Sequence, residues 1–421
     1  MLNKRYDAIV IGGGAAGMSA ANKLGKSGLK VALLEREAQL GGILNQCIHN
    51  GFGLHYFKEE LTGPEYAYRF IEPVSSISLI ETYLETTVIN IKRENQTKII
   101  QGFSKNLGLV QLSSNAVILA MGSRERNRGN IGIPGTRPSG IFTAGLAQRF
   151  VNIEGINPGK EVVIVGSGDI GLIMARRMTW IGSKVKAVIE IQPYPSGLTR
   201  NIVQCLNDFN IPLYLSHIVS KIYGIDRIEG VEVTPLENGK PVFDKRFKIE
   251  CDTLLLSVGL VPENELSKKA GVSLNPDTQG AYVDAHMMTS VDGIFSCGNV
   301  LHIHDLVDYV TEESERTANF LIKYLDGTIK KNLYPVKSGS NIKYVLPNWY
   351  DPSISNSFYL RSMIVKNNAK LIIRQNDEII KEKKLIHVQP SEMISVKLTE
   401  KDISKAFNSG GKNNILEFSI I

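Results

Sequence analysis

The sequence predicts an α/β fold, with two doubly wound domains built on parallel sheets and a small β-rich C-terminal domain. A strand, a glycine turn, a helix and a second strand occur in this order twice, with first glycines at Gly12 and Gly166, as is typical of such sheets. Beyond Pro335, short apolar runs divided by polar turns predict strands instead. With 421 residues, 43% of them hydrophobic, the chain can bury more than one core.

The two repeats can be followed element by element. In the first, residues 6–11 are an apolar run of β-forming residues, an alanine-rich helix reaches about Lys26, and residues 30–34 form the next strand. The matching segments of the second repeat are the strand 161–165, the turn 166–171, the helix 172–181 and the strand 184–189.

Further strands and one helix complete these domains. Residues 115–122 and 252–259 are apolar runs that end in glycine and lead into proline-containing loops. A short strand is expected within residues 293–299 and a helix over residues 311–324. The strands expected in the C-terminal domain are 358–360, 371–374, 385–388 and 393–398.

The first glycine motif, Gly12-x-Gly14-x-x-Gly17, meets the physical requirements of a pyrophosphate site. Gly12 permits a tight turn, Gly14 has no side chain to block the phosphates, and Gly17 lets the helix pack closely on the strand. The N-terminus of the helix offers N–H groups and a partial positive charge. Glu35, at the end of the next strand, can accept hydrogen bonds from ribose hydroxyls.

The second motif, Gly166-x-Gly168-x-x-Gly171, is followed by Glu190 at the end of the next strand. A carboxylate at this place favours a ribose 2′-hydroxyl over a 2′-phosphate, so NAD(H) is preferred to NADP(H). Arg200 could reach such a phosphate. A domain that no longer binds a nucleotide stays open as an alternative.

The positive charge lies at one end of the chain. The net charge is +6, and residues 331–421 contain fourteen Lys and Arg against eight Asp and Glu. This excess predicts a solvated basic face or a docking surface for an acidic partner. Binding to nucleic acid is not expected, because no basic motif is interleaved with aromatic residues.

The cysteines and the apolar runs point to a cytoplasmic protein. No run is long enough to cross a bilayer, and the motif at Gly12 leaves no room for a cleaved signal peptide. No Cys-x-x-Cys pair and no metal-ligand spacing occur among the cysteines, which are Cys47, Cys205, Cys251 and Cys297.

The two motifs and the segment Thr289-Ser290-x-x-Gly293-Ile294-Phe295-x-x-Gly298 together resemble the pyridine nucleotide-disulphide oxidoreductase superfamily, over about residues 5–325. The resemblance implies FAD in the first Rossmann-like domain, NAD(P) in the second, and a return of the chain to the FAD domain after about residue 265. The implied domains are an FAD-binding domain of residues 1–130 and 266–330, an inserted NAD-binding domain of residues 131–265, and a C-terminal domain of residues 331–421.

Four departures from the family pattern change what the resemblance implies. The cysteine pair that disulphide-reducing members carry after a Gly-Gly, here Gly41-Gly42, is absent, as is a Cys-x-x-Cys in the second domain, so a dithiol mechanism is not expected. Gly298 is followed by Asn299, where relatives have an Asp that holds a ribityl hydroxyl of FAD; an amide oxygen can accept the same bond. Ile173 stands where many relatives hold the nicotinamide with a Glu. The C-terminal segment lacks the His-Pro pair of the dimerising reductases.

Residues 41–47, 166–172 and 298–305 resemble one sub-branch of this superfamily. It includes FAD subunits similar to the sarcosine oxidase alpha subunit, opine oxidase and hydrogen cyanide synthase, and flavoproteins that accompany a glycerol-3-phosphate dehydrogenase-like protein. The resemblance implies a flavoprotein dehydrogenase partner, of the glycerol-3-phosphate dehydrogenase-like or the amine or amino-acid dehydrogenase-like type. Self-association is a further option.

Three residues are candidates for catalysis at the flavin, namely Cys47, His49 and His304. For Cys47 and His49 the alternative is a packed side chain without a chemical role. The pair His302-x-His304 has a spacing that can bind a metal, but no further ligands are evident, so no metal is expected.

The remaining candidates bind cofactors. Asp305 or Asp308 is expected to cap the helix that runs to Tyr324, whose positive end would face the flavin. The residues expected to bind FAD or NAD(H) are Gly12, Gly14, Ala16, Gly17, Glu35, Arg36, Gly42, Ala120, Gly122, Gly166, Gly168, Asp169, Ile170, Glu190, Gly259, Gly298, Asn299 and Asp308.

Two functions agree with these features. The first is an FAD-dependent oxidoreductase that transfers a hydride between NAD(H) and FAD and exchanges electrons with a partner dehydrogenase subunit or a small acceptor. The second is a non-catalytic FAD-binding subunit of a dehydrogenase complex that does not use NAD. The second glycine motif with Glu190 favours the first, whereas Ile173 and Asn299 leave room for the second.

Overall fold

The computed structural model describes residues 2–330, 332–375, 378–405, 407 and 414–421. The chain forms two compact units, residues 1–123 with 262–421, and residues 124–261. The second unit is therefore inserted into the sequence of the first. The connecting segments contain β11 (Ser123–Glu125) and β21 (Leu260–Pro262). Lys331, the expected first residue of the C-terminal domain, lies outside the described residues.

The first unit is built on a five-stranded parallel sheet in the order β22-β10-β2-β3-β6. Along the central strand, Ala8 and Val10 belong to one hydrophobic cluster, and Ile9 and Ile11 to another. Both faces of the sheet are thus covered, which explains why this strand is apolar throughout. The strands are β2 (Ala8–Ile11), β3 (Val31–Leu34), β6 (Ile80–Tyr83), β10 (Ala116–Leu119) and β22 (Ile294–Ser296).

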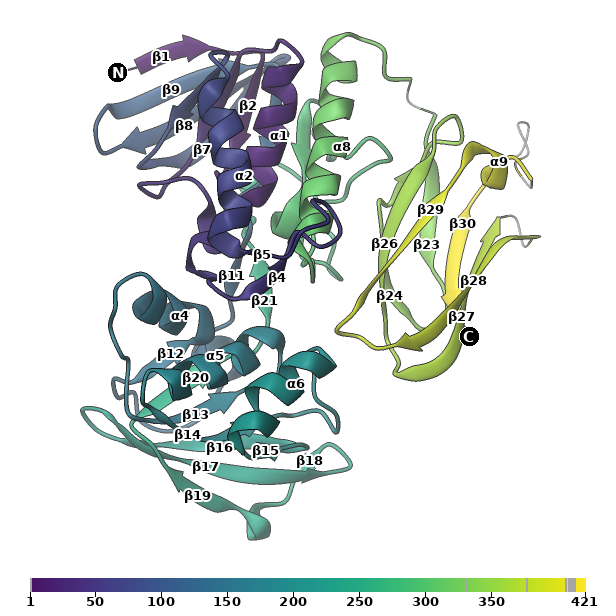
Figure 1. The fold of residues 1–421 in the computed structure, drawn as a ribbon. Coiled ribbons are helices and arrows are strands. Elements are labelled where there is room, and N and C mark those ends of the chain that lie inside the picture. Colours follow the sequence, from purple (N-terminus) through teal and green to yellow (C-terminus); the bar gives the residue numbers. More distant parts are fainter. Residues whose placement is uncertain (1, 331, 376–377, 406, 408–413) are drawn as a thin grey trace. The chain divides into compact units, whose positions relative to one another are not determined.

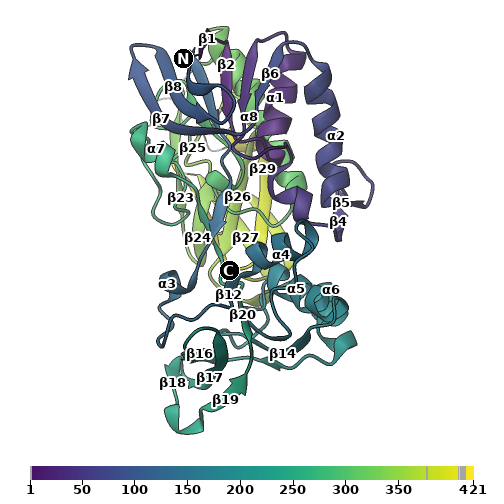
Figure 2. The same cartoon turned by 90° about the vertical axis from the view of Figure 1, so that its left-hand side faces the viewer.

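Helices cover one face of this sheet, and strands of a second, mixed sheet contribute to the hydrophobic cluster on the other face. Helix α1 lies between α2 and α8 in Figure 1, and Figure 2 shows α1 and α2 side by side again. The helices are α1 (Ala15–Lys26), α2 (Gly63–Ser76), α7 (Glu265–Lys269) and α8 (Val307–Leu325), with η1 (Gly42–Gln46) and η4 (Gly298–Val300). This second sheet contains the antiparallel strands β7 (Thr86–Glu94), β8 (Thr97–Ser104) and β9 (Gly108–Ser114), and β1 (Leu2–Arg5), which pairs with β9 in parallel. The strands β4 (Asn50–Phe52) and β5 (Leu61–Thr62) form a small antiparallel pair.

The second unit repeats this design, with its glycine-motif strand again in the middle of five parallel strands, in the order β12-β20-β13-β14-β15. The strands are β12 (Ile141–Thr143), β13 (Glu161–Val165), β14 (Lys184–Ile189), β15 (Leu213–Tyr214) and β20 (Thr253–Leu256). The helices are α3 (Arg128–Ile131), α4 (Ala144–Asn152), α5 (Asp169–Trp180) and α6 (Thr199–Cys205), with η2 (Asn207–Phe209) and η3 (Phe243–Lys245). The antiparallel strands are β16 (His217–Gly224), β17 (Ile228–Glu237), β18 (Lys240–Pro241) and β19 (Phe247–Glu250).

The C-terminal strands form two sheets, β25-β23-β30-β27-β28 and β24-β26-β29, around a hydrophobic cluster of their own. Tyr344 and Leu346 instead join the cluster that also contains Ile9 and Ile11, so these strands pack on the rest of the first unit. The elements are β23 (Tyr334–Ser338), β24 (Ile342–Leu346), β25 (Trp349–Tyr350), β26 (Asn356–Ser362), β27 (Lys366–Gln375), β28 (Glu378–Val388), β29 (Met393–Leu398), α9 (Glu400–Ile403) and β30 (Leu416–Ile420).

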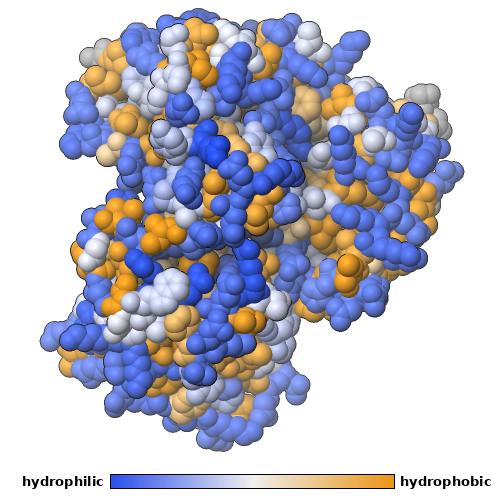
Figure 3. All heavy atoms as spheres, in the orientation of Figure 1, coloured by the Kyte–Doolittle hydropathy of each residue, from blue (hydrophilic) through white to orange (hydrophobic). Residues whose placement is uncertain are grey.

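The predicted fold class is confirmed, including the β-rich C-terminal strands. Helix α8 begins four residues before the predicted start at Thr311, and α5 begins at Asp169 rather than Leu172. The two additional four-stranded sheets, β1-β9-β8-β7 and that of β16 to β19, were not predicted from the sequence. Hydrophilic side chains make up much of the visible face of the C-terminal strands, which lie at the right in Figure 3.

Candidate functional site

The first glycine turn connects β2 to α1. Gly12 has a φ of 108°, and a side chain there would collide with the carbonyl oxygen of Ala120. A side chain on Gly17 would collide with the carbonyl oxygen of Gly12. Both positions therefore require glycine, because the helix lies directly against the strand ends.

Gly14 differs from these two glycines. A methyl group on Gly14 would meet no atom of the described chain within 4 Å, and the backbone conformation, with a φ of −78°, would accept a side chain. Steric packing inside the chain thus does not demand glycine here, whereas a phosphate lying against the backbone would. Gly42 frames the same place, because a methyl group on it would lie 3.1 Å from the Cα atom of Gly14. The first turn of α1 has no acidic residue, so the residues present fit a pyrophosphate.

Glu35 is buried beside this turn. Its Oε2 accepts a hydrogen bond from the Gly13 N–H at 2.6 Å, and its Oε1 accepts one from the Glu37 N–H at 2.8 Å. Each carboxylate oxygen has a second lone pair. Glu35 can therefore hold the glycine turn and accept ribose hydroxyls at the same time.

The structure also shows the neighbours or the backbone conformation of four other residues that were predicted to bind FAD. Gly298 lies against Ala16, since a methyl group on it would be 2.8 Å from the Ala16 Cβ atom. Asn299 Oδ1 accepts the backbone N–H of His304 at 3.0 Å. The side chain of Arg36 is exposed and lies 3.8 Å from a carboxylate oxygen of Glu37. Gly122, with a φ of 71°, follows β10.

The second glycine turn repeats the steric pattern of the first. Gly166 has a φ of 94°, and a side chain there would collide with the carbonyl oxygen of Ser257. A methyl group on Gly168 would meet only the Ser257 hydroxyl oxygen within 4 Å, at 3.8 Å. Ile170 is half-buried and Ile173 buried in α5, and Gly259 has a φ of 97° after β20.

The acidic groups of the second turn are more heavily engaged. Glu190 Oε2 accepts hydrogen bonds from the Ser167 N–H at 2.9 Å and from the hydroxyls of Ser167 and Ser196, and Oε1 accepts the Gln192 N–H at 2.8 Å. Asp169 stands in the first turn of α5. Its Oδ1 accepts the Leu198 N–H at 2.9 Å and an amide N–H of Asn201 at 2.6 Å.

The structure gives Cys47 and His49 different neighbours. Cys47 is buried at the end of η1, where its carbonyl oxygen accepts the Gly63 N–H at 2.8 Å. Burial raises the pKa of the Cys47 thiol to about 12, so the thiol is protonated near neutral pH. The His49 ring packs against Phe52, with ring centroids 5.0 Å apart. None of the four cysteines, all among the described residues, forms a disulfide.

The predicted helix cap is wrong. Leu306 is the N-cap residue of α8, and no side chain caps the helix. Asp308 is buried in the first turn, where its Oδ1 accepts the Tyr56 N–H at 2.8 Å. Asp305 instead pairs with Arg361 of β26 and accepts the Met393 N–H at 2.6 Å. Asp305 and Asp308 thus each connect segments that are far apart in the sequence. Neither carboxylate caps the first backbone N–H groups of α8.

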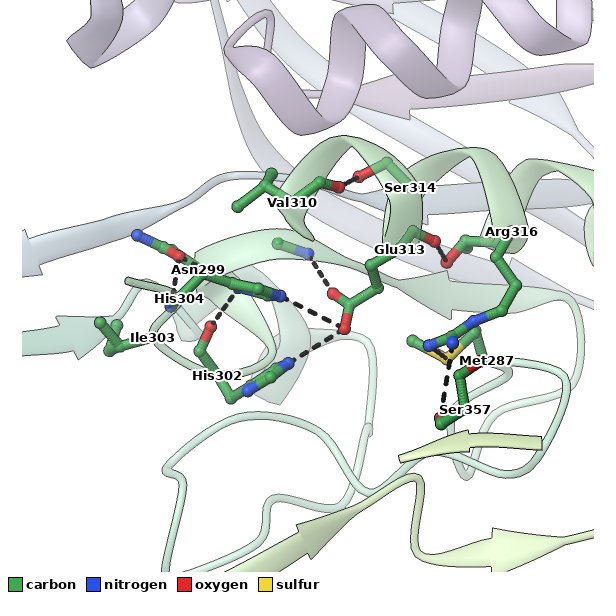
Figure 4. A network of polar contacts seen from close by, with 12 residues as sticks. Met287, Asn299, His302, Ile303, His304, Val310, Glu313, Ser314, Arg316 and Ser357 are labelled. Atoms are coloured by element: carbon green, nitrogen blue, oxygen red, sulfur yellow. Dashed lines mark hydrogen bonds and ion pairs between the residues drawn. The ribbon is translucent and has the colours of Figure 1, made fainter. Parts of the chain in front are cut away.

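His304 belongs to a buried cluster with His302 and Glu313, drawn in Figure 4. Glu313 Oε2 lies 3.0 Å from His302 Nε2 and 3.5 Å from His304 Nε2, and Oε1 accepts the Gly298 N–H at 2.7 Å. Burial lowers the pKa of His302 to about 4. Burial opposes ionisation of Glu313, but the two histidines outweigh it and hold its pKa well below the usual range.

Glu313 was not among the residues predicted from the sequence. It lies on the buried face of α8, three residues after Val310 and four before Thr317, both of which are also buried. A charged residue on the inner face of an amphipathic helix is unusual unless it is paired. The position of Glu313 on the buried face of the helix was the signal available in the sequence. A carboxylate is tolerated there because it pairs with His302 and His304.

Two glycine turns of the nucleotide-binding type, each on a parallel sheet with a buried glutamate, place the chain in the class of proteins with two Rossmann-like domains. The sequence profile of the pyridine nucleotide-disulphide oxidoreductase family matches residues 6–318. The chain belongs to this family, whose members typically bind FAD and NAD(P).

The curated relatives are distant. The opine oxidase A-type subunit of Agrobacterium tumefaciens is 26% identical over 318 residues, which cover 71% of this chain and 62% of that protein. The HcnB subunit of hydrogen cyanide synthase from Pseudomonas protegens is 25% identical over 295 residues, covering 65% of this chain and 60% of that protein. This chain thus spans less than two thirds of either relative.

Solved structures show the same fold. Thioredoxin reductase of T. acidophilum has a TM-score of 0.63 and 24% identity, and the match covers 77% of this chain and 99% of that one. L-proline dehydrogenase of P. horikoshii has a TM-score of 0.54 and 18% identity, covering 78% and 59%. No helix in the described residues is both long and apolar enough to span a membrane.

Proposed function

We propose that this chain binds FAD at the first glycine turn and NAD(H) at the second, and transfers a hydride between them. The observation that carries the proposal is the open space beside Gly14, which Gly42 and the N-terminus of α1 border. A bound pyrophosphate explains why this residue is glycine, whereas packing within the chain does not. FAD supplies the hydride and electron chemistry when bound. The residues of the chain need only hold and orient the two cofactors.

The proposed FAD ligands follow from this geometry. The N–H groups at the start of α1 bind the pyrophosphate, and the second lone pairs of the Glu35 carboxylate accept the ribose hydroxyls. We place the Gly298-Asn299 turn and the first turn of α8 beside the rest of the cofactor. Gly298 supports this placement because it packs on Ala16 of α1.

We further propose that electrons pass to or from a partner dehydrogenase subunit or a small acceptor. Two distant relatives, from opine oxidase and hydrogen cyanide synthase, are named as subunits, and the C-terminal residues carry the excess positive charge. A flavoprotein dehydrogenase subunit of glycerol-3-phosphate, amine or amino-acid type is the proposed partner. A cytoplasmic location and the lack of nucleic-acid binding stay sequence-based predictions.

Anaerobic reduction tests the proposal. The purified protein is expected to be yellow and to release FAD on denaturation. NADH should bleach the flavin at least about tenfold faster than NADPH, because Glu190 disfavours a 2′-phosphate. Stopped-flow absorbance of the flavin with each nucleotide measures both rates. Recovery of FMN, or faster bleaching by NADPH, would contradict the assignment.

The alternative is an FAD-binding subunit that does not use NAD. Two observations favour it, namely the carboxylate of Asp169 in the first turn of α5 and the apolar side chain of Ile173. An anion at a helix N-terminus occupies the place that attracts phosphate in other such turns. Retention of FAD with no bleaching by either nucleotide would support this alternative over hydride transfer.

A further inference from the structure

His302, His304 and Glu313 place three metal-binding atoms together inside the first unit. The two histidines lie on the segment between η4 and α8, and Glu313 reaches them from the second turn of α8, as Figure 4 shows. Their ligand atoms all lie within 4.8 Å of one another. His302 is 1%, Glu313 0% and His304 8% exposed, so these groups are removed from solvent.

The hydrogen bonds of His304 define where its proton lies. Its Nδ1 is 3.1 Å from the carbonyl oxygen of His302 and 3.3 Å from Asn299 Oδ1, which already accepts the backbone N–H of His304. Both neighbours are acceptors, so Nδ1 carries the proton and donates it. In the neutral ring, Nε2 then has a lone pair.

That lone pair faces another acceptor. His304 Nε2 lies 3.5 Å from Glu313 Oε2 and has no hydrogen-bond partner among the described residues. Two lone pairs facing each other in a buried site are unfavourable unless a cation lies between them. The cluster therefore needs either a second proton on His304 or a metal ion.

We propose that His302 Nε2, His304 Nε2 and Glu313 Oε2 bind one divalent transition-metal ion. In a tetrahedral site with metal–ligand distances of about 2.0–2.1 Å, the ligand atoms are about 3.3–3.4 Å apart. The separations of 3.0 and 3.5 Å from Glu313 Oε2 to the two ring nitrogens lie on either side of this spacing. Two nitrogens and one carboxylate oxygen suit zinc or ferrous iron better than magnesium or calcium.

The groups around the three ligands also fit a metal. Metal-bound histidines usually donate their other N–H to an oxygen, which fixes the ring. His304 does so to a backbone carbonyl, and His302 Nδ1 lies 3.4 Å from the Tyr344 hydroxyl. The second oxygen of Glu313 accepts the Gly298 N–H at 2.7 Å. The site thus joins the Gly298-Asn299 turn, α8 and the C-terminal strand β24.

Metal content of the full-length protein tests this proposal. The purified protein is stripped with a chelator, dialysed, and loaded separately with Zn²⁺, Fe²⁺ and Mn²⁺, with iron handled anaerobically. About one equivalent of Zn²⁺ or Fe²⁺ should remain bound after desalting, measured by inductively coupled plasma mass spectrometry. The result does not depend on NADH oxidation, so it stands apart from the proposed hydride transfer.

Variants then locate the ion. His304→Gln and Glu313→Gln should each lose most of the bound metal, whereas the exposed His387→Gln should keep it. Circular dichroism and thermal unfolding check that the variants are folded. Absence of bound metal in the loaded unmodified protein would overturn the proposal and leave a doubly protonated His304 paired with Glu313. Unchanged metal content in a folded His302→Gln, His304→Gln double variant would also overturn it.

Discussion

The two glycine turns of this chain share a steric plan and differ in charge. In both, the first glycine has a positive φ and lies against the carbonyl oxygen at the end of a neighbouring strand, that of Ala120 or Ser257. In both, a buried glutamate accepts the N–H of the residue between the first two glycines. The turns therefore arise from the same backbone requirements.

The difference lies at the helix N-termini. The first turn of α1 has no acidic residue, whereas that of α5 contains Asp169, whose carboxylate anchors Leu198 and Asn201. Ser196 also donates its backbone N–H to the Ser167 hydroxyl at 2.9 Å. Residues 196–201 are thus tied to the second turn by hydrogen bonds.

The glycine pattern therefore defines the geometry of a turn, but it does not set the affinity of the turn for a nucleotide. A carboxylate near the N-terminus of α5 offsets part of the positive potential that attracts a pyrophosphate. We therefore expect tight binding at the first turn and weaker, more readily exchanged binding at the second. That order suits a resident FAD and a diffusing NAD(H).

The largest effect is expected from side chains that would occupy the proposed phosphate-binding positions at Gly14 and Gly168. Gly14→Val should weaken FAD binding by about 100-fold or more, because several charge-assisted hydrogen bonds to the pyrophosphate are lost together. Gly168→Val should leave FAD bound and abolish reduction by NADH. Both glycines have negative φ values and few neighbours, so a side chain adds little strain.

The two valine variants serve as controls for each other. FAD content after gel filtration and the rate of anaerobic bleaching are measured for both. If Gly168→Val also releases FAD, or if Gly14→Val retains it, the two turns do not have the separate roles proposed here.

A smaller effect is expected at Glu190, a residue that is 3% exposed. Arginine at this buried position would disrupt the bonds to Ser167 and Gln192, so glutamine is the better substitution. Glu190→Gln should reduce the preference for NADH over NADPH by up to about tenfold, because a like-charge contact with the 2′-phosphate is removed. The ratio of bleaching rates measures it, and Glu35→Gln should leave that ratio unchanged.

The sequence predicted the backbone of these sites better than their polar surroundings. Gly12, Gly17 and Glu35 follow a local pattern in which each residue type has a steric or hydrogen-bonding reason, and the structure brings them together. The contacts of Asp169 with Leu198 and Asn201 depend on how residues about thirty positions apart meet, which periodicity does not reveal.

The C-terminal strands also show that local sequence patterns do not predict contacts between distant segments. Short strands were predicted from apolar runs divided by polar turns, but their pairing was not, because register and sheet order depend on distant segments. Asp305 looked like a helix cap, since it precedes a helical segment. Its actual partner is Arg361 on β26, more than fifty residues later, which no local pattern could identify.

Removing the negative charge at the N-terminus of α5 should make the second turn more like the first. Asp169→Asn keeps an oxygen that can accept the Leu198 N–H but removes the charge. NADH should bind about two- to fivefold more tightly, the size expected for one charge near a helix N-terminus. Kd values for NADH from titration at low salt measure this, with Asp244→Asn, an exposed aspartate in η3, as the control. Weaker binding would mean that the anchor of residues 196–201 matters more than the charge.

The smallest effect is expected at Cys47, which follows η1, the short helix whose first residue, Gly42, lies against Gly14. Its pKa of about 12, raised by burial, lies well above neutral pH, so the folded protein keeps this thiol protonated up to strongly alkaline pH. A protonated, buried thiol is a poor nucleophile.

Cys47→Ser should therefore change the rate of flavin reduction by NADH less than about twofold, since hydride transfer between the two cofactors needs no thiolate. The same rates are expected for both proteins between pH 6 and about pH 9, because the thiol does not ionise in that range. Stopped-flow bleaching across this range is the measurement, with FAD content determined on each sample. A rise of the unmodified protein's rate with pH that disappears in Cys47→Ser would show a reactive thiolate. So would loss of bleaching with FAD still bound, and either result would give the first turn a chemical group that the second lacks.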